Sequence, residues 1–324
     1  MDAPAADIIQ PLGHGIFAID TGFQRPRFDA AYLLVDGGRA AFIDTGTRHA
    51  LPRLLCALSW VGLGPEAVDW VIPTHVHLDH AGGVGPLMQA LPQARLMVHP
   101  RGARHMIDPS ALYQGALAVY GQAEMDRSYG ELMGVDAARV DTSVDGMPLQ
   151  VGDRTLTLID TPGHALHHHC IWDPVSRGWF TGDTFGISYR ELDSPTGAPW
   201  IFPTSTPVQF QPDALRESVQ RLLAAQPDAV YLTHYGRLGD VQGLGVQLLG
   251  LLDQVQALDL TSADAATDSP SRHTALRDGL KKLYIGSLRQ HGCMLTDVAI
   301  ADALAIDIEL NAQGMGVWLD RQKR

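Results

Sequence analysis

Three histidines and one aspartate within six residues constrain this chain more than any other feature. The run Thr74-His75-Val76-His77-Leu78-Asp79-His80 directly follows residues 68–73, an apolar stretch typical of a buried strand. Packed imidazoles and a carboxylate are costly to desolvate, but they are the ligands that zinc prefers. The spacing puts His75 and His77 on one side of an extended turn and Asp79 and His80 on the other, so one loop can serve two metal ions. The alternative is a solvated histidine-rich turn.

Short apolar runs alternate with helical spacing through the first part of the chain. Strands are expected at residues 15–20, 31–36 and 40–44, with Gly37-Gly38 as a hairpin turn between the last two. Residues 50–60 carry apolar side chains at helical spacing. Strands and helices that alternate in this way indicate a layered α/β domain.

The pattern changes near residue 240. Further strands are expected at residues 155–160, 169–172, 178–181 and 229–233. Beyond about residue 240 the strand signals vanish, and residues 243–258 and 272–290 show helical spacing. We therefore expect an α/β catalytic domain over residues 1–240 and a helical C-terminal extension, residues 241–324, packed on it.

Composition narrows the class of protein. Acidic residues outnumber basic ones by 36 to 24, for a net charge of -12, which disfavours a protein that grips a nucleic-acid backbone. No apolar stretch is long enough to span a membrane, and acids stand where a signal peptide would carry Lys or Arg. The three cysteines, Cys56, Cys170 and Cys293, are too far apart for a disulfide framework. These features predict a cytoplasmic protein that acts on a small molecule.

Four further motifs accompany the histidine run, each at the end of an expected strand. They are Ile43-Asp44-Thr45-Gly46, Thr161-Pro162-Gly163-His164, Thr181-Gly182-Asp183 and Leu232-Thr233-His234-Tyr235-Gly236. Singly, a Gly-Asp pair is usually a turn, an Asp-Thr-Gly is often a strand end and a lone Thr-His is more often a surface histidine. Five motifs in one order are far more specific. With them the chain resembles the metallo-β-lactamase superfamily, whose hallmark is His-x-His-x-Asp-His after a strand. The resemblance covers roughly the first three-quarters of the chain.

This resemblance implies a fold and a set of metal ligands. The fold is a four-layer αβ/βα sandwich with two metal ions at one edge of two packed sheets, and the helical C-terminal appendage lies outside the resemblance. One ion is expected to bind His75, His77 and His164, and the other Asp79, His80 and His234, with Asp183 bridging the two. Zinc is the expected metal, and iron or manganese also suit these ligands.

The resemblance also implies hydrolysis by a hydroxide that bridges the two metals. One metal would polarise the substrate oxygen and the other would stabilise the leaving group. Asp79 is expected to orient the nucleophile or carry its proton. Asp44 is expected to fix a ligand imidazole through the ring nitrogen that the metal leaves free.

The expected substrate is a carboxylic ester, thioester or lactone. The full ligand set resembles that of glyoxalase II-like thioesterases and acyl-homoserine lactonases. Three alternatives remain: a phosphodiesterase or nuclease, which the acidic charge disfavours; a mononuclear iron sulfur dioxygenase; and a non-catalytic scaffold, which would be expected to have lost ligands. A homodimer through the helical C-terminal region is a further expectation.

A long segment with little periodicity, residues 184–212, leaves directly from Asp183. Its aromatic residues are expected either to line a substrate pocket or to pack beneath the loop: Phe185, Tyr189, Trp200 and Phe202. In the neighbouring run His167-His168-His169, strand alternation turns at least one side chain away from the site. We expect His168 to lie near the metals without binding one.

Overall fold

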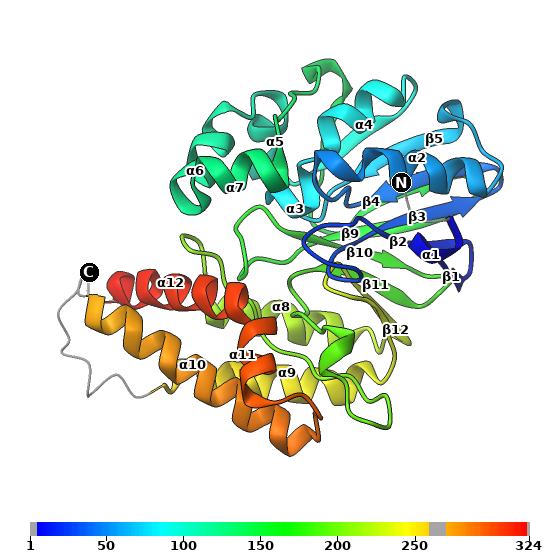
Figure 1. Ribbon diagram of the computed structural model, residues 1–324. Coiled ribbons are helices and arrows are strands. Elements are labelled where there is room, and N and C mark those ends of the chain that lie inside the picture. Colours follow the sequence, from blue (N-terminus) through cyan, green and yellow to red (C-terminus); the bar gives the residue numbers. More distant parts are fainter. Residues whose placement is uncertain (1–4, 259–269, 323–324) are drawn as a thin grey trace. The chain divides into compact units, whose positions relative to one another are not determined.

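The computed structural model describes residues 5–258 and 270–322, which form two compact units. The first, here called the sheet unit, comprises residues up to 160, 167–182 and 227–239. The second, here called the helical unit, comprises residues 161–166, 183–226 and 240 onward. Figure 1 follows the chain through both units.

The first sheet of the sheet unit contains seven strands in sequence order. They are β1 (Ile9–Gly13), β2 (Ile16–Asp20), β3 (Ala30–Asp36), β4 (Arg39–Ile43), β5 (Val68–Ile72), β6 (Arg95–Val98) and β7 (Val140–Thr142). Neighbours from β1 to β4 pair antiparallel, and those from β4 to β7 pair parallel. Gly37 and Gly38, both with positive φ, form the turn between β3 and β4, which confirms the expected hairpin.

The second sheet has six strands in the order β13-β12-β11-β10-β9-β8. They are β8 (Met147–Val151), β9 (Arg154–Asp160), β10 (His169–Asp173), β11 (Gly178–Gly182), β12 (Ala229–Leu232) and β13 (Gly236–Leu238). Only β11 and β12 among these pairs run parallel. Both sheets are therefore mixed, and both belong to the sheet unit.

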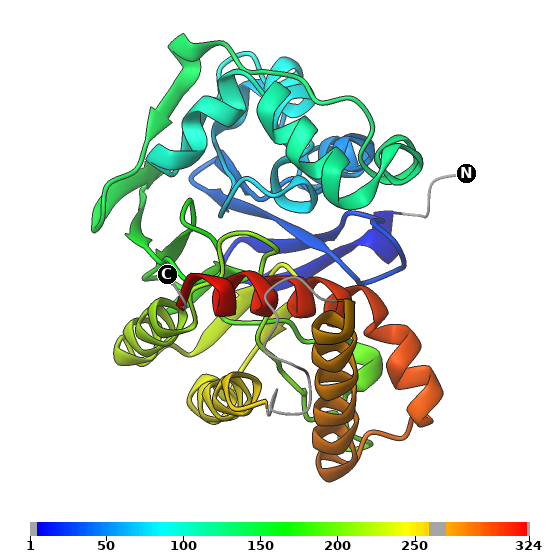
Figure 2. The ribbon, with the colours of Figure 1, turned by 90° about the vertical axis from the view of Figure 1, so that its left-hand side faces the viewer.

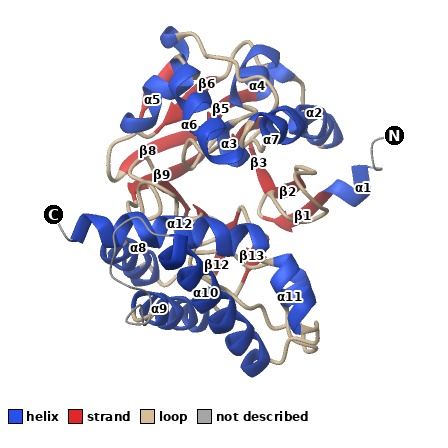
Figure 3. Ribbon diagram, turned by 60° about the vertical axis from the view of Figure 1, so that its left-hand side comes forward, coloured by secondary structure: helices blue, strands red, loops and turns tan. Residues whose placement is uncertain are grey.

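Alternating side chains of the first sheet supply two separate cores. Tyr32 and Leu34 of β3 share one core with Leu158 and Phe180 of the second sheet. The Tyr32 hydroxyl also donates to the carbonyl of Leu232 in β12, which links the sheets directly. Leu33, on the opposite face of β3, belongs to the other core, with helical residues. The two sheets thus pack face to face, and the strands (red) are seen in Figure 3.

Helices cover the outer face of the first sheet. Leu54 and Leu58 of α2 and Leu87 of α4 pack in the core that contains Leu33, on the side where α2 and α4 lie in Figure 1. The helices of the sheet unit are α1 (Ala5–Ile8), α2 (Leu51–Trp60), α3 (Leu78–Ala81), α4 (Val84–Ala90), α5 (Pro100–Ile107), α6 (Ser110–Tyr120) and α7 (Gln122–Glu124). Apolar residues at helical spacing give α2 and α4 the apolar face that packs on the first sheet.

The helical unit contains the remaining helices of the described residues. They are α8 (Pro212–Ala224), α9 (Val241–Gln256), α10 (Pro270–His291), α11 (Asp297–Ala303) and α12 (Ala305–Gln322). The Thr296 side chain caps α11 by accepting from Ala299 N. Helix α10 packs against α12, drawn in orange and red in Figure 2.

Two mixed sheets flanked by helices, with a helical C-terminal region, confirm the expected α/β sandwich class. The predicted domain boundary near residue 240 stays a prediction. Within residues 5–258 and 270–322, none of the helices combines the length and the apolarity that crossing a bilayer requires.

Candidate metal centre

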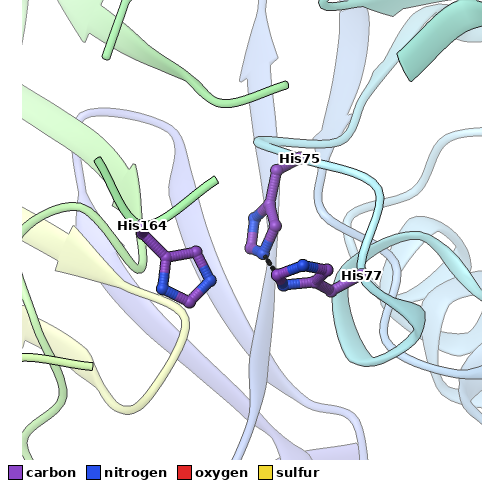
Figure 4. Close-up of side chains that lie close together, drawn as sticks. All are labelled: His75, His77 and His164. Atoms are coloured by element: carbon purple, nitrogen blue, oxygen red, sulfur yellow. Dashed lines mark hydrogen bonds between the residues drawn. The ribbon is translucent and has the colours of Figure 1, made fainter. Parts of the chain in front are cut away.

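The loop after β5 changes backbone conformation at His77. His77 is extended, with φ -66° and ψ 153°, and caps the single helical turn of α3, which contains Asp79 and His80. His75 and His77 therefore precede the helical turn, while Asp79 and His80 lie within it. His75 Nε2 lies 2.7 Å from His77 Nδ1, the hydrogen bond dashed in Figure 4. His164, also labelled in Figure 4, belongs to the helical unit and is described with it.

Asp79 and His80 lie close to His234, which directly follows strand β12 of the second sheet. The candidate ligand atoms of these three residues all lie within 4.8 Å of one another. Asp79 Oδ2 is 3.8 Å from His80 Nε2 and 3.4 Å from His234 Nε2. Two imidazole Nε2 atoms thus face one carboxylate oxygen.

Asp44 fixes the orientation of His80. His80 Nδ1 is 2.8 Å from Asp44 Oδ2, and both side chains are almost completely buried, with 0% and 1% exposure. A carboxylate only accepts, so Nδ1 carries the proton and Nε2 keeps its lone pair. Asp44 also accepts from Thr74 N at 2.7 Å, from Thr74 Oγ1 at 3.0 Å and from Thr233 Oγ1 at 2.7 Å. Asp44 therefore joins the histidine run to the last motif.

A backbone carbonyl orients His234. His234 Nδ1 is 2.8 Å from the oxygen of Phe28, so this ring too has a proton on Nδ1 and an acceptor-type Nε2. The Phe28 ring packs edge-on to His234, with centroids 5.3 Å apart. The next residue, Asp29, is fully buried, and burial raises the pKa of its carboxyl to about 8.

Two residues of the 167–169 run lie beside His75. The His168 ring stacks on the His75 ring at 4.8 Å, and the His167 ring is edge-on to His77 at 5.4 Å. Gly182 makes room for His168, because a Cβ at Gly182 would lie 2.6 Å from His168 Nε2. The expectation that His168 binds no metal stays a prediction.

His169 begins β10 and is held as a neutral ring away from these contacts. Nε2 lies 2.9 Å from the Pro73 oxygen and Nδ1 lies 2.8 Å from Ser143 Oγ, so one nitrogen donates and the other accepts. Burial lowers the pKa of His169 to about 3. Below about pH 6.5 the His169 side chain is therefore protonated in the unfolded chain but stays neutral in the folded protein.

We expect this difference to reduce stability in acid. From pH 7 to pH 5 the unfolded state gains a proton on His169 and the folded state does not, so about 2 kcal/mol of stability is lost. In the His169→Gln variant this contribution disappears. Urea unfolding at both pH values measures it, and the variant should lose less stability than the wild type over this interval. Equal losses in both proteins would contradict the neutral assignment.

The helical unit provides the other two predicted ligands. His164 Nε2 lies 3.4 Å from Asp183 Oδ2, and His164 Nδ1 lies 3.3 Å from the Thr204 oxygen. The glycine before His164 has φ 135°, and a Cβ there would lie 2.3 Å from the backbone of Leu215. The Pro-Gly-His motif therefore brings this turn against the start of α8, as only glycine allows.

The aromatic residues of segment 184–212 are buried within the helical unit. Trp200 stacks on Phe202 at 4.9 Å, and Phe202 packs against Tyr284 of α10 at 5.3 Å. The Tyr189 hydroxyl donates to Asp307 of α12. Phe185 is likewise fully buried. These contacts are those of a packed core, and a role for Phe185, Tyr189, Trp200 and Phe202 in a substrate pocket stays a prediction.

Thr74, Thr233 and the Phe28 carbonyl help to hold the metal-binding candidates in place and were not predicted from the sequence. Thr74 and Thr233 each precede a candidate ligand, and their hydroxyls bind Asp44. Their recurrence before His75 and His234 was a usable signal. The Phe28 carbonyl gives no signal, because any residue carries a carbonyl.

The donor set suits a divalent metal ion. Each of His80 and His234 has its Nδ1 proton bound by a protein acceptor, so Nε2 offers a lone pair beside an Asp79 oxygen. Oriented imidazole with an outer acceptor on the second nitrogen is the usual arrangement of histidine at metal sites. Nitrogen and carboxylate ligands fit zinc, iron or manganese.

Comparison with known proteins identifies the family. The profile of the metallo-beta-lactamase superfamily matches residues 13–234, which include the first four motifs and the fifth as far as His234. The chain belongs to this superfamily. The solved structure of a superfamily protein from Sulfolobus tokodaii superposes with a TM-score of 0.62 at 22% identity, covering 86% of this chain and 99% of that chain. This likeness supports the fold.

Two curated relatives are named as hydrolases. The hydroxyacylglutathione hydrolase of Salmonella typhi is 31% identical over 163 residues, 49% of this chain and 49% of that protein. The atrochrysone carboxyl ACP thioesterase of Aspergillus fumigatus is 27% identical over 183 residues, 56% of this chain and 48% of that protein. The chain thus spans about half the length of each.

Proposed function

We propose that the chain is a metal-dependent hydrolase that cleaves a carboxylic ester, thioester or lactone. The observation that carries the proposal is the pair of oriented rings, His80 and His234, whose Nε2 atoms both face Asp79 Oδ2. Building such a cluster with buried acceptors behind each ring is costly unless a cation occupies it. The family and the two hydrolase relatives support the same activity.

We further propose a ligand set for two ions, with zinc as the metal. Asp79, His80 and His234 would bind one ion, and His75 and His77 would contribute to the other. His164 and Asp183 are included because their motifs follow in the order that the family pattern requires. The complete proposed set is His75, His77, Asp79, His80, His164, Asp183 and His234.

Bound ions would supply Lewis-acid activation of water and of the scissile carbonyl. The residues of the chain would provide orientation and proton transfer. Asp44 holds His80, and the Phe28 carbonyl holds His234, so both rings are fixed before substrate arrives. The Asp79 carboxylate has a second oxygen that would orient the attacking water or accept its proton.

Among the three kinds of carbonyl substrate we favour a thioester. One relative is named as a thioesterase, and the other is named for hydrolysis of an acylglutathione. The acidic balance of the chain disfavours a nucleic-acid substrate. A small-molecule substrate agrees with the family, while a homodimer through residues 241–324 and a cytoplasmic location stay predictions.

A hydrolysis panel tests the proposal. The purified protein would be assayed on a thioester, a carboxylic ester, a lactone and a phosphodiester, before and after metal removal by a chelator and re-addition of zinc. We expect turnover of a carbonyl substrate, lost with the metal and restored with zinc. Turnover of the phosphodiester alone would show that the protein is a phosphodiesterase. No turnover of any of the four substrates after zinc re-addition would contradict the proposal.

A further inference from the structure

The segment between β2 and β3, residues 21–29, places the Phe28 carbonyl against His234. Its two ends are joined by Thr21 and Asp29. Thr21 N donates to the Asp29 carbonyl at 3.0 Å, and the Thr21 hydroxyl lies 3.1 Å from the same carbonyl and 2.9 Å from Asp29 Oδ2. Phe23 N in turn donates to the Thr21 hydroxyl oxygen at 3.3 Å. The backbone N–H and the hydroxyl of one threonine thus close the loop together.

This closure lies directly beside the residue that orients His234. Asp29 follows Phe28, and the next residue, Ala30, donates its N–H to the Thr233 carbonyl at 2.8 Å. The Phe28 carbonyl is therefore fixed from one side by the contacts of Thr21 to Asp29 and from the other by the start of β3. Thr21 is 4% exposed and Asp29 is fully buried, so water does not replace these contacts.

The first of the five motifs, which contains Asp44, Thr45 and Gly46, contacts Thr21. A Cβ at Gly46 would lie 2.7 Å from Thr21 Cγ2, so only glycine lets Thr21 approach so closely. Two residues earlier, Asp44 holds His80. This motif therefore contributes to the orientation of both rings. Asp44 binds His80 directly, and Gly46 packs against Thr21, which lies beside the carbonyl that binds His234.

We propose that Thr21 and Asp29 are positioning residues for His234, acting through the Phe28 carbonyl. The proposal rests on the metal-binding role of His234 in the proposed function. Without the closure, residues 21–29 could shift the carbonyl and release the His234 ring. The ring would then need to be ordered when a metal binds, which weakens affinity.

A pair of Thr21 variants separates positioning from general stability. Thr21→Ser keeps the hydroxyl but loses the methyl that packs on Gly46, and Thr21→Val keeps the methyl but loses the hydroxyl. Both should lower stability. Only Thr21→Val should weaken binding of zinc, by about tenfold. The measurement is competition for zinc between the metal-free protein and a chromophoric chelator, with the cobalt(II) absorption spectrum as a second readout of ligand geometry.

Ser143→Ala provides the matched control. It removes another buried hydroxyl of the sheet unit, one bound to His169 and not to the metal-binding candidates. It should lower stability and leave zinc affinity and the cobalt spectrum unchanged. Wild-type zinc affinity in Thr21→Val, or equal losses of affinity in all three variants, would overturn the positioning role alone. A wild-type protein that binds no zinc would overturn the proposed function and this inference with it.

Discussion

Replacing His80 with alanine is expected to reduce hydrolysis of the best carbonyl substrate by about a thousandfold. A Lewis-acid metal supplies several kcal/mol of transition-state stabilisation, and each 1.36 kcal/mol is a factor of ten in rate. His80 offers Nε2 to the cluster with Asp79 and His234, and alanine offers no ligand. The effect should appear in kcat and in the zinc content of the purified variant.

His105→Ala is the control for this substitution. His105 lies in α5 and hydrogen-bonds Arg104, and it takes no part in the cluster. We expect its activity and zinc content to match the wild type. A His80→Ala variant that keeps full activity and full zinc would show that the ligand assignment is wrong.

Asp44→Asn should weaken zinc binding about ten- to hundredfold, the range seen when an outer partner of a metal ligand is lost. Asp44 has φ 55°, a left-handed conformation that asparagine tolerates. Its carboxylate accepts from His80 and from the two threonines Thr74 and Thr233. An amide offers one oxygen, so at least one of these donors loses its acceptor. Chelator competition measures the loss of affinity.

Asp173→Asn is a matched control for that variant. Asp173 is fully buried in the same unit and accepts from Arg154 and Ser176. Each substitution should lower the free energy of unfolding by about 1–3 kcal/mol, because each leaves a buried donor unsatisfied. Only Asp44→Asn should lose affinity for zinc. If Asp173→Asn loses as much, the effect of Asp44 is on stability and not on His80.

The sequence predicted the motifs and most of the strands because both depend on local patterns, whereas β1, β7, β8 and β13 were not predicted. The Gly37-Gly38 hairpin and the strand before His75 follow from short-range residue preferences. The histidine run was informative because its residues are expensive to bury without a cation. The histidine run does not show which groups orient the imidazole rings. The contact of His234 with Phe28 joins residues more than two hundred positions apart, and Phe28 contributes only its backbone carbonyl.

Helix α12 shows a second limit of sequence patterns. The pattern of residues 300–310 indicates a short helix, whereas α12 extends from Ala305 to Gln322. Its buried face includes Asp307, Asn311 and Gly314 beside the apolar Ile308 and Met315. Asn311 accepts from Ser205 N, and a Cβ at Gly314 would lie 2.2 Å from Ser205 Oγ. Polar and small residues that pack against another segment give no apolar periodicity.

The metal content of the intact protein tests the central claim most directly. Native mass spectrometry of the wild-type chain, purified and then exposed to zinc, counts the ions that remain bound. The proposed ligand set predicts two ions per chain, with at least one lost in His80→Ala. A chain that binds no ion after exposure to zinc, iron and manganese would contradict the account.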